Sequence, residues 1–101
     1  MSPKTEREKM LAGETYNCLD PGLNLERQQV KRLLRLFNQA ETSPEQLALL
    51  QQLLGGIGQN SLIWPPFHCV YGKNIYLGDN VFLNVLCTIL DCNEVRLGNH
   101  V

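Results

Sequence analysis

The sequence has 101 residues, the size of a single domain, and its net charge of −1 gives no electrostatic reason to expect nucleic acid or an anionic membrane as a partner. With 44% hydrophobic and 19% charged residues, the composition is that of a folded globular chain and not of a disordered one. No apolar run approaches the ~20 residues that span a bilayer, and the polar N-terminus is unlike a signal peptide, so we expect a cytoplasmic protein.

Two helices are expected before residue 41. Residues 4–12 predict a short helix with Met10 and Leu11 as its apolar contact and Gly13 as its stop. The Asp20-Pro21-Gly22 segment is a strong turn signal. A longer helix is expected over residues 24–40, because the residues of one face recur at spacings of three and four: Leu23, Arg27, Val30, Leu33, Leu34 and Phe37.

The third helix has the clearest start and stop signals. Ser43 is the expected N-cap, Pro44 stands at the first helical position, and Gln46 completes a capping-box pattern. The Gly55-Gly56 pair is expected to end the helix. Its buried stripe is predicted to consist of Leu47, Leu50 and Leu54.

Residues 61–67 contain two consecutive prolines. Pro65 and Pro66 each disfavour helix at the residue before them, so this segment is expected to be extended. We expect Trp64 to pack there as a lid over the end of the structure that follows.

From residue 57 onward the sequence repeats. An aliphatic-Gly-polar-polar unit occupies residues 57–60, 77–80 and 97–100, a spacing of 20 residues. The aliphatic positions step by six in two frames, one with Leu77, Leu83, Ile89, Val95 and Val101 and the other with Ile57, Ile63, Cys69, Ile75, Val81 and Cys87.

A period of six is typical of a triangular parallel β-helix, in which each short strand contributes an inward aliphatic residue and a corner follows. Glycine at a corner is expected to tolerate positive φ, and Asn or Asp there to bond the local backbone. A β-meander with Gly-Asp and Gly-Asn hairpin turns is the alternative, but it gives no reason for a repeat of 20 residues.

The expected fold class is therefore α+β, with a helical segment over residues 1–56 followed by the first coils of a β-helix over residues 57–101. A solenoid usually needs about three repeats and a capping unit. Since only about two coils are present and neither is a cap, we expect this chain to be the N-terminal portion of something longer.

The four cysteines are Cys18, Cys69, Cys87 and Cys92, and none forms a C-x-x-C pair. Two of them fall on inward positions of the repeat. We therefore predict reduced packing residues, and neither a disulfide nor a metal site is expected.

Three longer motifs extend along the chain. They are Glu-Lys-Met-Leu-Ala-Gly-Glu-x-Tyr over residues 8–16, Pro-Pro-Phe-His-Cys-Val-Tyr-Gly-x-Asn-Ile over residues 65–75, and Leu-Gly-Asp-Asn-Val-Phe-x-Asn over residues 77–84. Together they resemble the maltose and galactoside O-acetyltransferase family of hexapeptide-repeat enzymes. The resemblance implies a left-handed β-helix, a homotrimer with active sites between subunits, acetyl-CoA as the donor and a sugar hydroxyl as the acceptor.

The resemblance also implies general-base catalysis by a histidine in a His-Pro motif. That motif is absent from these 101 residues, in which the histidines are His68 and His100. Neither matches the family's catalytic histidine, so we interpret them as a solvated and a turn-forming histidine. No catalytic residue is therefore assigned, and the chain alone is expected to be inactive.

The substrate-binding residues that the resemblance implies are Asp20, Arg27, Phe82, Asn84 and Asp91. Asn84, Asp91 and Phe82 match family positions that line the sugar site. Asp20 and Arg27 match positions that close over the acceptor, although Asp20 is also a natural turn residue and Arg27 could simply be solvated. The sequence does not indicate residues that bind acetyl-CoA.

Two functions from different classes stay open at this point. One is a sugar O-acetyltransferase, represented by its N-terminal part. The other is a non-catalytic remnant or an assembly module built on the same fold. Continuation of the reading frame beyond Val101 into a coil with a His-Pro motif would favour the enzyme.

Overall fold

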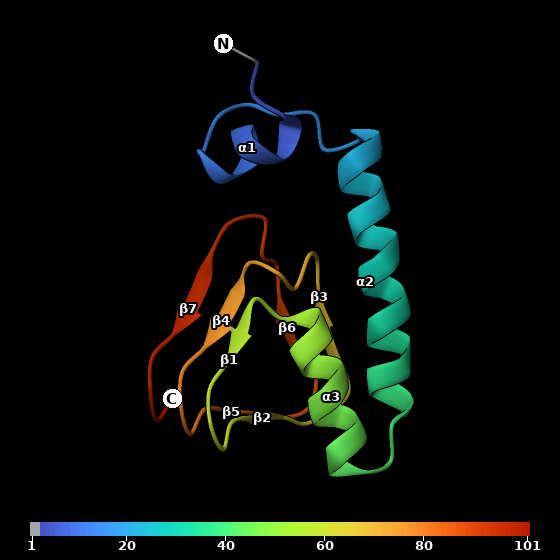
Figure 1. The fold of residues 1–101 in the computed structure, drawn as a ribbon, viewed down its shortest axis with the longest axis vertical. Coiled ribbons are helices and arrows are strands. Elements are labelled where there is room, and N and C mark those ends of the chain that lie inside the picture. The colour runs from blue at the N-terminus through green and yellow to red at the C-terminus, as the bar shows by residue number, and fades with distance from the viewer. Residues whose placement is uncertain (1–2) are drawn as a thin grey trace.

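The computed structural model describes residues 3–101, in which three helices precede seven short strands (Figure 1). The helices are α1 Glu6–Leu11, α2 Pro21–Gln39 and α3 Ser43–Leu53. The strands are β1 Gly56–Ile57, β2 Leu62–Ile63, β3 Phe67–Cys69, β4 Ile75–Leu77, β5 Phe82–Leu83, β6 Cys87–Ile89 and β7 Val95–Leu97. Residues 1 and 2 of the expected segment 1–56 lie outside the described part, in which no helix is long and apolar enough to cross a membrane.

Helix α1 is shorter than expected and begins at a capping box. The Thr5 hydroxyl accepts from the backbone N–H of Glu8, and the Glu8 carboxylate accepts from the N–H of Thr5. Gly13 follows with φ +77°, as a helix stop requires. Met10 is buried, but Leu11 is 36% exposed, so the prediction of Leu11 as a core contact is wrong.

Helix α2 begins at Pro21, three residues before the expected start. The Asp20 carboxylate accepts from the N–H groups of Gly22 and Leu23, which makes Asp20 the N-cap. Pro21 stands at the first helical position, where its missing N–H costs nothing. The Asp20-Pro21-Gly22 segment is therefore the start of the helix and not a separate turn. The buried residues are Leu23, Val30, Leu34 and Phe37.

Helix α3 has the expected length but different contacts. Its N-cap is Thr42, which makes no side-chain cap bond, and Gln46 Nε2 instead donates to the carbonyl oxygen of Ala40 at 3.1 Å. The predicted capping box is therefore wrong. Leu50 and Leu54 are buried as predicted, but the third buried leucine is Leu53, whereas Leu47 is 42% exposed.

The seven strands wind into a three-faced coil of parallel strands. The sheets have the orders β1-β4-β7, β2-β5 and β3-β6, and every pair is parallel. Gly56 faces Tyr76, and Tyr76 faces Arg96, so each coil takes 20 residues as the repeat predicts. The antiparallel β-meander is excluded for these strands. The element order, with the helices before the parallel coil, agrees with the predicted α+β fold class.

Aliphatic residues of both sequence frames fill the coil. Ile63, Ile75, Leu77 and Val81 are at most 5% exposed, and Cys69 and Cys87 pack against them as predicted. Among the described residues all four cysteines are free. The interior of the coil is continuous with Phe37 of α2 and with Leu50 and Leu53 of α3. One hydrophobic core therefore joins the helices to the coil.

The glycines of the first corner are needed for close stacking and not for positive φ. A Cβ at Gly58 would stand 2.3 Å from the carbonyl oxygen of Gly78 in the next coil. Positive φ falls instead two residues later, at Asn60, Asn80 and His100, with values of 59°, 57° and 62°. The expected positive φ is therefore not found at Gly58, Gly78 and Gly98, but it is found at Gly72, which lies between β3 and β4 and has φ +73°. His100 is a turn-forming residue, as predicted.

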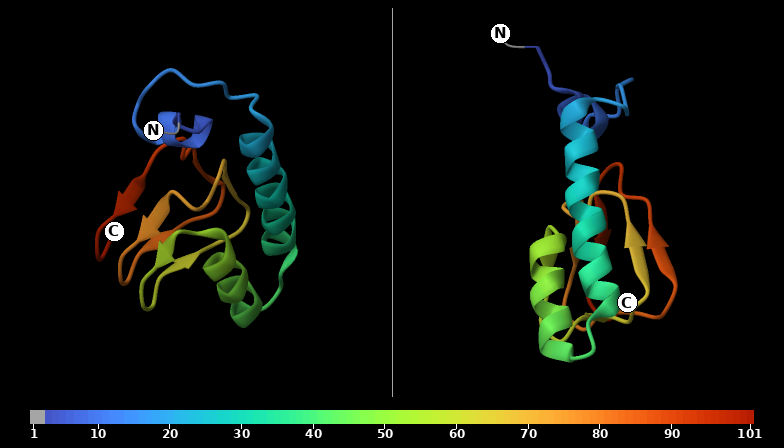
Figure 2. Two further views of the ribbon diagram at one scale, coloured as in Figure 1. Left: turned by 45° about the horizontal axis from the view of Figure 1, so that its top comes forward. Right: turned by 90° about the vertical axis from the view of Figure 1, so that its right-hand side faces the viewer.

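Helices α2 and α3 lie side by side against the coil (Figure 2). The Asn38 side chain of α2 pairs with the backbone of Phe67, accepting from its N–H at 2.9 Å and donating to its carbonyl oxygen at 3.1 Å. Trp64 is 50% exposed and does not close the coil, so the lid prediction is wrong. The first coil is covered by the helices.

Candidate functional site

The five predicted substrate-binding residues lie beside two different corners of the coil, and Figure 1 shows the elements that carry them. One, here called the Tyr71 corner, comprises residues 70–74 and 90–94 beside α1 and the start of α2. The other, the Asn84 corner, comprises residues 64–66 and 84–86, which follow β2 and β5. Asp91 belongs to the first corner and Asn84 to the second. Within one chain these residues do not form a single cluster.

Asp91 is the most buried polar residue at the Tyr71 corner. It is 0% exposed, and its Oδ1 accepts from the N–H groups of Val70 and Tyr71 at 2.9 and 3.0 Å. Among the described residues its Oδ2 has no hydrogen-bond partner. The Asp91 carbonyl oxygen accepts from the buried Asn74 amide at 2.8 Å. In this chain the carboxylate therefore positions the backbone that precedes β4.

Arg27 connects α2 to this corner. Its Nη1 donates to the Tyr71 hydroxyl at 2.8 Å, and its Nη2 donates to the carbonyl oxygen of Cys18 at 2.7 Å. The guanidinium carbon also lies 5.9 Å from the centre of the Tyr71 ring. Because Tyr71 is only 2% exposed, it acts as a fixed support for Arg27. Arg27 is thus an organised side chain and not a freely solvated one.

Asp20 lies at the N-terminus of α2, where its carboxylate is already used as the helix cap. It lines a small cavity of about 430 Å³ that Arg7 also borders. Arg7 donates to Glu26 at 2.7 Å and to Asn74 at 3.0 Å, which joins this cavity to the Tyr71 corner. Asp20, Arg27 and Asp91 therefore belong to one side of the molecule.

Phe82 and Asn84 lie on the outer face of β5 and at its end. The Phe82 ring packs edge-to-face against Trp64 with 4.9 Å between ring centres, and the two rings are 42% and 50% exposed. Asn84 is exposed, and its Oδ1 accepts from the N–H of Val85 at 2.8 Å. Its amide nitrogen has no hydrogen-bond partner among the described residues, and an exposed amide of this kind can donate to a ligand.

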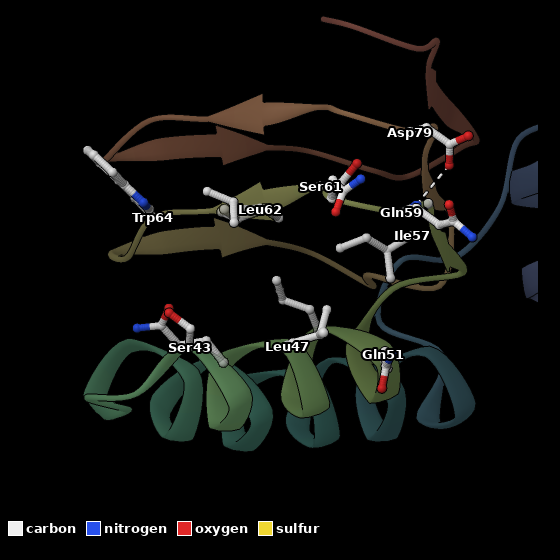
Figure 3. A pocket seen from close by; sticks show the side chains of 14 residues that line it. Ser43, Leu47, Gln51, Ile57, Gln59, Ser61, Leu62, Trp64 and Asp79 are labelled. Carbon is white, nitrogen blue, oxygen red and sulfur yellow. Dashed lines mark hydrogen bonds between the residues drawn. The ribbon is translucent and has the colours of Figure 1, made fainter.

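A larger cavity of about 740 Å³ opens between α3 and the strands of the first coil (Figure 3). Trp64 and Ser43 lie at one end of it, and Gln51, Gln59 and Asp79 lie at the other. Its floor is formed by aliphatic side chains that include Leu47 and Ile57. None of the predicted site residues lines it.

Burial raises the pKa of the Cys69 thiol to about 12, with a smaller contribution from the Asp91 carboxylate. Cys69 is therefore held in its neutral form and is not a nucleophile. His68 is exposed on β3, as predicted for a solvated histidine. In the part of the chain that the structure describes, no three His, Cys, Asp or Glu side chains gather as metal ligands.

Tyr71 and Trp64 lie at these corners but are not among the residues predicted to bind substrate. Tyr71, the partner of Arg27, had a signal, because a tyrosine close to the end of a buried strand usually finds a hydrogen-bond partner for its hydroxyl group. Trp64 also had a sequence signal, because it directly follows Ile63, whose side chain points into the coil. Successive side chains of a strand point to opposite faces. Alternation predicts that Trp64 points outward.

Comparison with known proteins agrees with this architecture. Residues 9–58 match the model of the maltose acetyltransferase hexapeptide capping motif. Nodulation protein L of Rhizobium meliloti strain 1021 is 41% identical over 98 residues, which cover 95% of this chain and 54% of that protein. Galactoside O-acetyltransferase of Lactococcus lactis is 38% identical over 103 residues, covering 98% of this chain and 50% of that protein.

Solved structures match at the level of the backbone. A maltose O-acetyltransferase from Clostridium difficile 630 superimposes with a TM-score of 0.92 at 36% identity, over 97% of this chain and 54% of that one. A hexapeptide-repeat acetyltransferase from Vibrio cholerae, complexed with acetyl-CoA, gives a TM-score of 0.86 at 37% identity, over 94% of this chain and 52% of that one.

The chain belongs to the maltose and galactoside O-acetyltransferase family. It spans about half the length of the curated relatives it matches. Both corners described above, and the helices beside them, lie within the matched region of this family member.

Proposed function

We propose that this family member supplies the acceptor side of an enzyme that transfers an acetyl group from acetyl-CoA to a hydroxyl of a sugar. The observation that carries the proposal is the similarity over nearly the whole chain to proteins named as acetyltransferases, one of them complexed with acetyl-CoA. The proposal includes the left-handed winding of the β-helix that the resemblance implies. It also includes the division of the chain into a helical segment, residues 1–56, and the start of the β-helix, residues 57–101.

The reaction needs an acceptor hydroxyl that loses its proton as its oxygen attacks the thioester carbonyl, with coenzyme A leaving as the thiol. Asn84 supplies an exposed amide that bonds a sugar hydroxyl, and Phe82 supplies an apolar surface for a sugar ring. Arg27, fixed by Tyr71, binds the acceptor from the other side together with Asp20. Asp91 positions Tyr71 through its backbone N–H.

The two corners are brought together by a homotrimer with its sites between subunits. Within one chain, Arg27 of α2 contacts the Tyr71 corner whereas Asn84 lies at the other corner, so one copy contributes only half of an acceptor site. A neighbouring copy supplies the other half. This separation supports the trimer that the family resemblance implies.

A general base is not among these 101 residues, because the sequence holds no His-Pro pair and neither His68 nor His100 matches the family's catalytic histidine. We therefore infer that residues 1–101 alone do not turn over acetyl-CoA. This expectation can be checked by following release of the coenzyme A thiol in the presence of maltose and galactosides.

The activity itself is tested in a chimera that joins residues 1–101 to the C-terminal half of the Lactococcus lactis galactoside O-acetyltransferase. We expect transfer of radiolabelled acetyl groups to a mono- or disaccharide, with the 101-residue chain alone as the inactive control. A folded chimera that binds acetyl-CoA but acetylates no sugar would refute the proposed function.

A further inference from the structure

An exposed aromatic pair marks one end of the cavity between α3 and the first coil. Trp64 and Phe82 are 50% and 42% exposed. Burial of such large apolar side chains stabilises a fold strongly, so their exposure is unusual. Their edge-to-face contact, with 4.9 Å between ring centres and 82° between planes, holds both rings in place. The pair is therefore a preformed apolar surface open to a ligand.

This surface continues directly to Asn84. Leu62 faces Phe82 and Ile63 faces Leu83, and the N–H of Trp64 donates to the carbonyl oxygen of Leu83 at 2.9 Å. Extending this parallel register by one residue places Trp64 beside Asn84. A ligand held by Asn84 can therefore reach the aromatic pair, and from there the cavity.

The cavity combines an aliphatic floor with amide and hydroxyl groups. Along its walls lie Ser43 and Gln51 from α3, and Gln59 and Asn60 from the first corner of the coil (Figure 3). Amide side chains both donate and accept hydrogen bonds, and so do hydroxyl groups. At about 740 Å³ the cavity falls within the ordinary range of small-molecule sites, roughly 300–1,000 Å³.

The charge of the cavity restricts the class of ligand. Among the described residues that line it, Asp79 is the one ionisable side chain, and its Oδ1 already accepts from the N–H of Gln59 at 2.8 Å. No lysine or arginine lines the cavity in this part of the chain. A phosphate-bearing ligand such as coenzyme A would lack a cationic partner here. The lining suits a neutral ligand that is rich in hydroxyl groups.

We propose that this cavity binds a neutral oligosaccharide, with one sugar ring packed on Trp64 and Phe82 beside Asn84 and further rings bonded by the amide-lined walls. Sugar rings carry one face of C–H groups that packs on aromatic carbon, and hydroxyl groups at their edges. The inference rests on the proposed function in one respect, since Asn84 joins the cavity to the acceptor side of the reaction.

The single tryptophan of the sequence makes the site directly observable. The 101-residue chain is titrated with maltotetraose and with the tetramer of N-acetylglucosamine, while Trp64 emission and its quenching by acrylamide are recorded. We expect saturable protection from quenching by at least one tetramer, with an affinity at least about tenfold higher than for its monosaccharide, because several rings make contacts. An anionic tetramer of galacturonic acid is expected to bind more weakly than the neutral tetramer that protects Trp64 best.

Two variants keep Trp64 as the reporter and remove parts of the site. Phe82→Leu removes the partner ring, and Gln51→Ala removes one amide from α3. Each is expected to weaken tetramer binding by about three- to tenfold. Gln28→Ala is the matched control, because Gln28 is an exposed glutamine on α2 that does not line the cavity, and it is expected to bind as the parent chain does.

The proposal is overturned if neither neutral tetramer protects Trp64, or if Phe82→Leu and Gln51→Ala bind as tightly as Gln28→Ala. It is also overturned if Trp64 emission changes on dilution but not with sugar, since a second copy of the chain would then occupy the cavity. These titrations contain no acetyl-CoA. Acetylation of a monosaccharide by the chimera, without tetramer binding here, would contradict this inference and leave the proposed function intact.

Discussion

Gly58 and Gly98 occupy the same position in the first and third turns of the repeat but face different surroundings. A Cβ at Gly58 would stand 2.3 Å from the backbone carbonyl oxygen of Gly78, whereas a Cβ at Gly98 would meet nothing within 4 Å. The spacing of the repeat stacks Gly58 on Gly78, but it does not show how closely the two backbones approach each other. The distinction is a property of packing and not of backbone conformation, because neither glycine has positive φ.

We predict that Gly58→Ala lowers the free energy of unfolding by about 1–3 kcal/mol or more, since backbone must move to admit the methyl group. Gly98→Ala is the matched control and should change it by less than about 0.5 kcal/mol. Urea denaturation followed by circular dichroism measures both. Equal losses in the two variants would mean that stacking does not explain these glycines.

Cys69 illustrates a residue whose chemistry follows from its burial. Its thiol pKa is raised from an ordinary value near 9 to about 12, chiefly by burial and secondarily by the Asp91 carboxylate. The raised pKa makes the thiolate of Cys69 much scarcer at neutral pH than that of an exposed cysteine. Because the folded-state pKa is the higher one, the stability that this thiol contributes is fully present below pH 9 and is lost as the pH rises through 12.

In a thiol titration with an aromatic disulfide reagent at pH 8, the exposed Cys18 and Cys92 should react in the fast phase. Cys69 should react at least about 100-fold more slowly, because its thiolate is scarce and its side chain is packed in the core. Mass spectrometry identifies which thiol has reacted. Labelling of Cys69 together with Cys18 would contradict the burial of the thiol. Cys69→Ala should leave the fast phase unchanged.

At the scale of elements, the sequence predicts which segments are helical or repetitive much better than where they begin. The apolar spacing of three and four identifies α2, but the start of that helix is ambiguous because Asp20-Pro21-Gly22 suits a turn and a capped helix equally well. The capping box of α3 fails because the N-cap is Thr42, one residue before the expected Ser43, so Gln46 stands at the fourth helical position and not at the third. Its side chain donates instead to the Ala40 carbonyl oxygen.

The coil itself is predictable from the sequence because its register repeats every 20 residues. The candidate site is harder to predict from the sequence. Asn84 and Arg27 match family positions, but their placement at two separate corners follows from how strands and helices pack. The support that Asn38 gives to β3 has no sequence signal, since an asparagine near the end of an amphipathic helix is ordinary.

Asn38 offers a test of how α2 holds the coil. Asn38→Ala removes a donor and an acceptor from the backbone of the fully buried Phe67, so we expect a loss of about 2–4 kcal/mol in unfolding free energy. Asn38→Asp keeps the acceptor for the Phe67 N–H and should lose less. Gln39→Ala, one residue further on the exposed side of α2, should be close to neutral. Thermal melts of the three variants rank their stabilities. An Asn38→Ala variant as stable as Gln39→Ala would show that the two hydrogen bonds between Asn38 and Phe67 do not hold α2 against the coil.

At the scale of the whole molecule, the described chain is a helical cover joined by one hydrophobic core to a three-faced parallel coil. The proposed acceptor-side residues lie beside two different corners of that coil, so under the proposed function a single copy holds two half-sites. Completion of the site by a neighbouring copy is therefore the feature on which the proposed activity depends most.

That feature is tested most directly by acetyl transfer in mixed trimers of the chimera. Arg27→Gln subunits and Asn84→Ala subunits are each expected to lose at least about tenfold of sugar acetylation, because every site in either trimer lacks one contact to the acceptor. Trimers assembled from both kinds of subunit contain some sites with an intact Arg27 from one copy and an intact Asn84 from the next. We predict that the mixture acetylates sugar faster than either parent. A mixture no more active than its parents, although mixed trimers are present by native mass spectrometry, would contradict an acceptor site shared between subunits.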